Sequence, residues 1–135
     1  MSTQSALLAP RIFDGEAWHQ DAAVIVDGER VEAIVPRGAL PADIPVETIE
    51  TGFIAPGFID LQVNGGGGVM LNDRRDAQTI ATICAAHAQF GTTALLATLI
   101  TDTPAITAEA LEAGAEAVRH KVPGFLGLHI EGPHL

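Results

Sequence analysis

The sequence has little positive charge and no cluster of basic side chains. Its 135 residues include 7 Lys and Arg against 17 Asp and Glu, for a formal net charge of −10. Sequence-independent binding to nucleic acid and docking on an anionic membrane both require clustered Lys and Arg. The composition therefore argues against both kinds of partner, whereas a small anionic substrate, held by local groups, stays possible.

The sequence also lacks a cysteine pair and a long apolar run. Cys84 is the single cysteine, so no disulfide can form within the chain. The apolar runs are interrupted within about ten residues, whereas a membrane-spanning helix needs about 20. The N-terminus does not show the basic, apolar and small-residue order of a signal peptide. We therefore expect a cytoplasmic protein without a membrane partner, and 47% hydrophobic residues are ample for a core.

The first segment, residues 1–52, is expected to be a small β-rich unit. The stretch ALLAPRIFDG predicts one strand that ends in the Asp14-Gly15 turn. The stretch AAVIVDGERVEAIV predicts a hairpin, because Asp27-Gly28 separates two alternating β-branched runs.

The second segment, residues 53–135, is expected to alternate strands and helices. Strands are predicted within FIAPGFIDLQV at 53–63, entered through Pro56-Gly57, and at 92–98 and 125–130, and helices are predicted at 76–90 and 103–120. Pro104 in the first turn and Gly91 after a helix are typical start and stop signals. Strand, helix, strand, helix, strand is the pattern of parallel βαβ units. A three-stranded parallel sheet has too few helices to cover both faces, so the segment is expected to be the start of a larger α/β domain.

Polar side chains occur at the C-terminal end of each predicted strand of this second segment. They are Asp60, Gln62 and Asn64 on the first, Thr98, Thr101 and Asp102 on the second, and His129 and Glu131 on the third. Ligands of parallel α/β domains gather at this edge. Because residues two apart on a strand share a face, the three residues of the first group are expected to point one way, and so are His129 and Glu131. These two polar stripes are expected to face one centre.

Three other features carry no predicted site. His87 lies on the apolar face of the first helix, with no second histidine at helical spacing, so we interpret it as a core residue. The stretch NGGGG at 64–68 lacks the spacing of either nucleotide-binding glycine motif, although it would let the backbone approach another group closely. Cys84 has no basic neighbour on its helix and is interpreted as a small buried hydrophobe.

Three motifs at these positions resemble a known family. They are GFIAPGFIDLQVNGGGGVMLND at 52–73, GTTALLATLITD at 91–102 and GLHIEGPHL at 127–135. The chain is similar along essentially its whole length to the N-terminal part of the N-acetylglucosamine-6-phosphate deacetylases, in the amidohydrolase superfamily. The resemblance implies the first β/α units of a (β/α)8 metal-dependent barrel, preceded by strands of a small β-sandwich.

The resemblance also implies roles for residues of the three motifs. Many superfamily members have His-x-His where this chain has Gln62-Val63-Asn64, and amides at these positions imply a single-metal site. Neutral amides are poor zinc ligands but serve well as hydrogen-bonding groups, which agrees with that implication. The glutamate of the family's EGP motif is a metal ligand, which assigns that role to Glu131. Gln62, Asn64 and His129 are expected to line the site or contact substrate.

The implied reaction is hydrolysis of the acetamide of N-acetylglucosamine 6-phosphate to glucosamine 6-phosphate and acetate. The implied cofactor is one divalent metal ion per site, with zinc named first and iron, cobalt and manganese as alternatives. No catalytic residue is assigned within this chain, because the family's metal-binding histidines, catalytic aspartate and phosphate contacts lie C-terminal to the EGP motif. The chain ends four residues after Glu131, whereas a complete barrel needs about 200 residues or more.

Three hypotheses about the parent protein follow. The first is a longer deacetylase, expected to be a homo-oligomer, of which the isolated chain would be inactive. The second is another amidohydrolase, similar to a dihydroorotase or a cytosine deaminase, although those relatives generally keep the first-strand histidines. The third is a non-catalytic assembly piece, which would expose an apolar strand edge.

Overall fold

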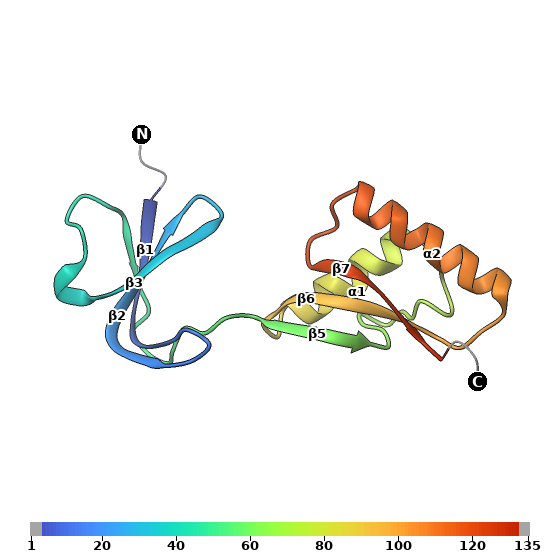
Figure 1. Cartoon of the computed structure of the whole chain (residues 1–135), viewed down its shortest axis with the longest axis horizontal. Helices are drawn as coiled ribbons and strands as arrows, with labels where there is room; N and C mark the ends of the chain where they lie inside the picture. Colours follow the sequence, from blue (N-terminus) through green and yellow to red (C-terminus); the bar gives the residue numbers. More distant parts are fainter. Residues whose placement is uncertain (1–3, 133–135) are drawn as a thin grey trace. The chain divides into compact units, whose positions relative to one another are not determined.

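The computed structural model describes residues 4–132 as two compact units that divide between Pro56 and Gly57 (Figure 1). The ranges 1–52 and 53–135 stay predictions, and residues 133–135 lie outside the described part. Within residues 4–132 no helix combines the length and the apolar character needed to cross a membrane.

The first unit is a four-stranded sheet with the order β3-β2-β1-β4. Its strands are β1 (Gln4–Phe13), β2 (Trp18–Asp27), β3 (Arg30–Pro36) and β4 (Val46–Thr48), with a short 3-10 helix, η1 (Arg37–Ala39), after β3. β2 pairs antiparallel with β1 and with β3, and β4 pairs parallel to β1. The predicted strand and hairpin are confirmed, with Gly28 at φ +59° in the turn. The sequence analysis did not predict β4 or η1.

Both faces of this sheet carry buried side chains. On β2, Ala22 and Val24 belong to one apolar cluster, and Ala23, between them, belongs to another. Successive strand residues point to opposite faces. Ile49 and Ile54 pack with the first cluster, and Leu40 and Ile44 pack with the second.

The second unit is a three-stranded parallel sheet with the order β5-β6-β7. The elements are β5 (Phe58–Val63), α1 (Ala77–Ala88), β6 (Thr92–Ile100), α2 (Pro104–Arg119) and β7 (Phe125–Glu131). α1 contacts β6 and α2, and α2 contacts β7 (Figure 1). The predicted β/α alternation is confirmed. β6 and β7 both continue further than predicted, so Glu131 is the last residue of β7.

Local hydrogen bonds start both helices of the second unit. The Asp76 carboxylate accepts a hydrogen bond from the Thr79 N–H at 2.7 Å, and the Thr103 hydroxyl accepts one from the Ile106 N–H at 3.3 Å. Such caps satisfy N–H groups that have no partner within the helix. Pro104 follows Thr103 at the first helical position, where its missing N–H costs nothing.

The core of the second unit lies between its sheet and its two helices. Ile80, Ile83 and Cys84 are buried, as the helical spacing of apolar residues predicts. They pack with Leu95, Ala97 and Leu99 of β6 and with three alanines of α2, Ala110, Ala113 and Ala117. Burial raises the pKa of the Cys84 thiol, which agrees with its interpretation as a small hydrophobe.

The N-cap of α1 allows a test of this account. Asp76→Ala should lower the free energy of unfolding by about 1 kcal/mol, because it removes the acceptor for the Thr79 N–H. The Thr79 N–H, and then the Arg74 guanidinium, lower the pKa of Asp76. The charged Asp76 carboxylate therefore stabilises the fold at pH values above the usual aspartate pKa. This contribution is lost as the pH falls through the lowered pKa of the folded state.

Urea unfolding of the wild type, Asp76→Ala and Asp76→Asn as a function of pH measures both effects. Asp76→Asn retains a capping oxygen that does not titrate, so its difference from the wild type should shrink at acid pH. Equal stability of Asp76→Ala and the wild type at about pH 7 would contradict the assignment of the cap.

Candidate functional site

Thr98, His129 and Glu131 lie on the face of the parallel sheet that the helices do not cover. On β6, Ala97 and Leu99 pack in the core against the helices, so Thr98 between them points to the opposite face. In the parallel ladder Thr98 pairs with His129, and Ile100 pairs with Glu131. The register therefore places His129 and Glu131 on the same face as Thr98, at the C-terminal end of the strands.

Gln62 of β5 is exposed, and its neighbour Val63 is buried in the core of the second unit. The expected alternation of Asp60, Gln62 and Asn64 is interrupted, because the register shifts between Asp60 and Val63. At this point the Asp60 carboxylate accepts a hydrogen bond from the Gln62 N–H at 3.1 Å. Asn64 follows the strand and is exposed. In the described part of the chain, no hydrogen bond joins either amide side chain to His129 or Glu131.

The carboxylate of Glu131 has one oxygen that is buried and unpartnered. Among residues 4–132, the buried side-chain polar atoms without a hydrogen-bond partner are Glu131 Oε2 and Thr98 Oγ1. A buried carboxylate oxygen without a partner is costly, and a bound cation would remove that cost. The chemistry and the burial of this oxygen therefore fit a metal ligand.

Glu131 could not hold a metal ion without further ligands. No group of three or more His, Cys, Asp and Glu side chains that could hold a metal ion exists within residues 4–132. Structural and catalytic zinc sites use three or four protein ligands. Further ligands would have to come from outside the described residues.

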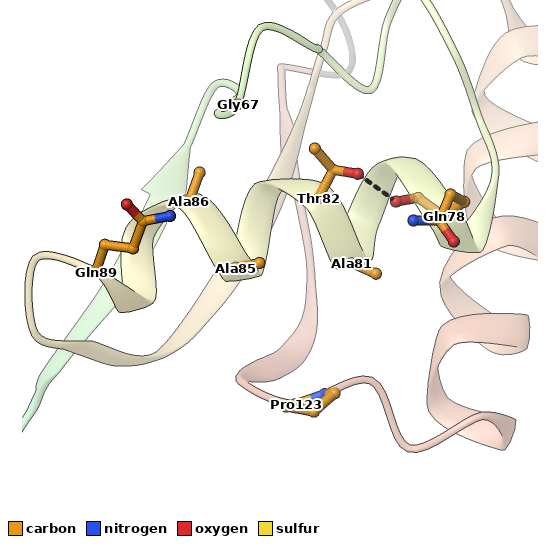
Figure 2. A pocket seen from close by; sticks show the side chains of 8 residues that line it. All are labelled: Gly67, Gln78, Ala81, Thr82, Ala85, Ala86, Gln89 and Pro123. Carbon is orange, nitrogen blue, oxygen red and sulfur yellow. Dashed lines mark hydrogen bonds between the residues drawn. The ribbon is translucent and has the colours of Figure 1, made fainter.

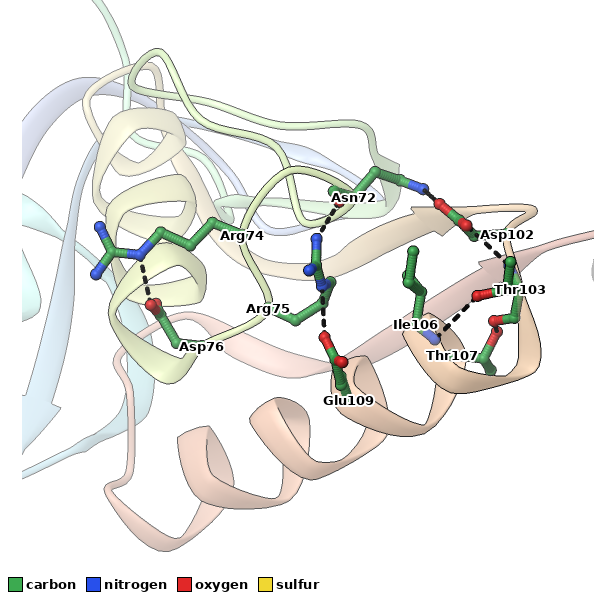
Figure 3. A network of polar contacts seen from close by, with 9 residues as sticks. All are labelled: Asn72, Arg74, Arg75, Asp76, Asp102, Thr103, Ile106, Thr107 and Glu109. Carbon is green, nitrogen blue, oxygen red and sulfur yellow. Dashed lines mark hydrogen bonds and ion pairs between the residues drawn. The ribbon is translucent and has the colours of Figure 1, made fainter.

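The side chain of Asn72 lies against the C-terminal end of β6 (Figure 3). Its Oδ1 accepts a hydrogen bond from the Ile100 N–H at 2.9 Å, and its Nδ2 donates to the Ile100 carbonyl at 2.9 Å and to the Asp102 carboxylate at 3.1 Å. The sequence analysis did not single out Asn72. Its partner is 28 residues away, and an asparagine that follows a glycine-rich stretch carries no local signal of such a contact.

The glycine-rich stretch packs on α1. The His87 ring donates a hydrogen bond from Nε2 to the Gly65 carbonyl at 2.9 Å. A Cβ at Gly66 would lie 3.0 Å from that ring, and a Cβ at Gly67 would lie 2.9 Å from Cγ2 of Thr82. The close approach predicted from the sequence is therefore an approach to a helix of the same unit. His87 is a hydrogen-bonded packing residue, in agreement with its interpretation.

A surface hollow of about 550 Å³ lies along α1, and neither His129 nor Glu131 lines it (Figure 2). Its lining consists of Gly67, Gln78, Ala81, Thr82, Ala85, Ala86, Gln89 and Pro123. None of these side chains is ionisable, and the Thr82 hydroxyl donates to the Gln78 carbonyl at 2.9 Å. The lining of the hollow provides no acid, no base and no metal ligand. The candidate site is therefore the face of the parallel sheet that carries Thr98, His129 and Glu131.

Comparisons with known proteins agree on a class and then on a family. The fold is shared with guanine deaminase of Escherichia coli, which superposes with a TM-score of 0.60 at 15% identity, over 98% of this chain and 39% of that chain. Together with the more similar structures described next, this likeness defines the class as the N-terminal part of an amidohydrolase barrel.

The family follows from more similar proteins. Residues 5–50 match the family model of the NagA composite domain. The crystal structure of N-acetylglucosamine-6-phosphate deacetylase from Pasteurella multocida superposes with a TM-score of 0.91 at 31% identity, over 98% of this chain and 35% of that chain. The resemblance found in the sequence is confirmed: the chain corresponds to the N-terminal portion of the N-acetylglucosamine-6-phosphate deacetylases.

Two curated relatives show how much of such a protein the chain covers. N-acetylgalactosamine-6-phosphate deacetylase of Shewanella sp. is 49% identical over 94 residues, which are 70% of this chain and 24% of the relative. N-acetylglucosamine-6-phosphate deacetylase of Haemophilus influenzae is 37% identical over 116 residues, 86% of this chain and 30% of the relative. The chain thus spans about a quarter to a third of their length.

The packing of the glycine-rich stretch allows a second prediction. Gly67 and Gly68 both have a positive φ, +62° and +82°, but a Cβ would meet Thr82 at Gly67 and nothing within 4 Å at Gly68. Both Gly67→Ala and Gly68→Ala should cost backbone strain of about 1–2 kcal/mol. Gly67→Ala should cost about 1 kcal/mol more in unfolding free energy, because it also overpacks the contact with α1. Equal losses of unfolding free energy in the two variants, measured by urea unfolding, would contradict the packing of Gly67 on Thr82.

Proposed function

We propose that the chain is the N-terminal part of a longer enzyme that hydrolyses the acetamide of N-acetylglucosamine 6-phosphate, giving acetate and glucosamine 6-phosphate. The observation that carries the proposal is the buried, unpartnered Glu131 Oε2 at the C-terminal end of β7, in a chain similar to N-acetylglucosamine-6-phosphate deacetylases. A structure of the Mycobacterium smegmatis deacetylase in complex with N-acetylglucosamine 6-phosphate, 28% identical to this chain, supports the choice of substrate class.

Glu131 would hold one divalent metal ion, with zinc as the first choice and iron, cobalt or manganese as alternatives. Such an ion supplies a Lewis acid for the amide carbonyl and a water that is nucleophilic near neutral pH. The remaining ligands, the general base and the phosphate contacts would follow this chain in the sequence. We assign no catalytic acid or base within the chain.

The other predicted residues would act on the substrate side of the site. His129 lies on the same face of the sheet as Glu131, and Gln62 and Asn64 lie at the C-terminal end of β5. Amide side chains both donate and accept hydrogen bonds, which suits contacts with sugar hydroxyls better than contacts with a metal ion. Gln62, Asn64 and His129 would therefore orient the substrate.

A second candidate substrate is N-acetylgalactosamine 6-phosphate, which differs from the first in the orientation of one hydroxyl. The Shewanella relative, 49% identical to this chain, is named as a deacetylase of that sugar phosphate. The Haemophilus influenzae relative, 37% identical, is named as a deacetylase of N-acetylglucosamine 6-phosphate. The reaction and the role of Glu131 are the same for both.

The setting of the enzyme is part of the proposal. We propose a cytoplasmic homo-oligomer with neither a nucleic-acid nor a membrane partner. The net charge of −10 and the scattered acidic residues support the absence of those partners.

Glu131→Gln in the longer protein tests the metal ligand. The variant should lose bound metal and deacetylation, because an amide replaces the charged ligand. Metal should raise the melting temperature of the wild type and leave that of the variant unchanged. Without metal, the variant should be at least as stable as the wild type, because no buried carboxylate oxygen is left unpartnered.

Glu112→Gln, the same change at an exposed position of α2, is the matched control and should leave metal content and activity unchanged. Metal content is measured by elemental analysis, and acetate release by a coupled assay. Wild-type metal content in Glu131→Gln would remove Glu131 from the ligands.

Competition between the two sugar phosphates tests the substrate. We expect kcat/KM for N-acetylglucosamine 6-phosphate to exceed that for N-acetylgalactosamine 6-phosphate by about 10-fold or more, because a site that hydrogen-bonds one hydroxyl rejects its misplaced counterpart. The reverse preference would establish the second candidate and leave the role of Glu131 intact.

A further inference from the structure

The C-terminal end of β6 extends beyond the end of β5. There the side chain of Asn72 forms the hydrogen bonds that a longer β5 would form with β6. Val63, the last residue of β5, pairs with Ala97, whereas β6 continues to Ile100. In a parallel ladder the N–H and C=O of one residue point to the same neighbouring strand. Both groups of Ile100 hydrogen-bond to the amide of Asn72, each at 2.9 Å. Asn72 therefore replaces a strand at this edge.

Asn72 is itself held from the other side (Figure 3). Arg75 donates one hydrogen bond to the Asn72 carbonyl and another, at 3.0 Å, to the Glu109 carboxylate on α2. The Asp102 carboxylate, which accepts from Asn72 Nδ2, also accepts from the Thr103 N–H at 2.8 Å. The amide of Asn72 is thus fixed relative to the N-terminal part of α2 and the end of β6.

The residue after Ile100 connects this edge to Glu131. The Thr101 hydroxyl donates a hydrogen bond to the Glu131 carbonyl at 2.6 Å, and Ile100 is the ladder partner of Glu131. Glu131 is the last residue of β7, where regular support from the ladder ends. The main chain of Glu131 is therefore held by the Thr101 hydroxyl and by its pairing with the end of β6. The end of β6 is held by the hydrogen bonds between Asn72 and Ile100.

We propose that Asn72 and Thr101 are positioning residues, which fix the main chain of Glu131 so that its unpartnered carboxylate oxygen keeps one orientation toward the metal. This inference rests on the proposed role of Glu131 as a ligand. Groups that orient a ligand are commonly worth about 10-fold to 100-fold in metal affinity. Neither residue is expected to touch the metal or the substrate.

Thr101→Val tests the proposal in the longer protein, because valine keeps the shape of threonine and removes the hydroxyl. Zinc affinity, measured by competition with a chelator, should fall about 10-fold. At saturating zinc, KM for the sugar phosphate should stay unchanged and kcat should largely recover. Thr101→Ser, which retains the hydroxyl, should restore the affinity.

Thr107→Val is the matched control, since the Thr107 hydroxyl donates to the carbonyl of Thr103, the N-cap of its own helix, at 3.1 Å. It should leave zinc affinity unchanged. If Thr101→Val does not fold, as judged by the melting temperature of the metal-free protein, Asn72→Ser serves instead, because serine is too short to reach Ile100. It should also weaken zinc binding about 10-fold.

Two results would overturn the proposal, and they are distinguishable. Wild-type zinc affinity in Thr101→Val or Asn72→Ser, together with loss of zinc in Glu131→Gln, would remove the positioning role and leave the proposed function intact. Wild-type zinc affinity in Glu131→Gln would remove the ligand itself, and the proposed site with it.

Discussion

The parallel pairing of β6 with β7 is the constraint on which the candidate site depends. It sets Thr98 opposite His129 and Ile100 opposite Glu131, so the alternation of β6 decides which face each side chain of β7 occupies. Leu95, Ala97 and Leu99 are committed to the core against the helices, and this leaves the opposite face for polar groups. A shift of the register by one residue would bury Glu131 against α2 and expose core residues.

Local signals in the sequence predict most of the fold of the second unit. Pro104 in the first turn of α2, the stop at Gly91 and the apolar face of the first helix act over a few residues, and all of them have the predicted role in the structure. The Asp76 cap of α1 was not predicted. β4 was missed because three exposed residues, Val46–Thr48, give no apolar pattern of their own and pair through the backbone with β1.

The site is less predictable, because its contacts join residues that are far apart in the sequence. Periodicity placed Glu131 at a strand end, but its metal role came from the family resemblance and not from spacing. The support from Asn72 and Thr101 involves partners 28 and 30 residues away, which no local pattern reveals. Simple alternation also does not predict the register shift between Asp60 and Val63, where the Asp60 carboxylate accepts a hydrogen bond from the Gln62 N–H.

The central claim is that Glu131 holds a metal ion at the C-terminal edge of the sheet. A crystal structure of the longer protein grown with zinc, with anomalous data collected at the zinc edge, tests it most directly. The account predicts a zinc ion about 2.0–2.2 Å from a carboxylate oxygen of Glu131, with the other ligands supplied by residues beyond this chain. A zinc ion held entirely by other residues, with Glu131 Oε2 still unpartnered, would contradict it.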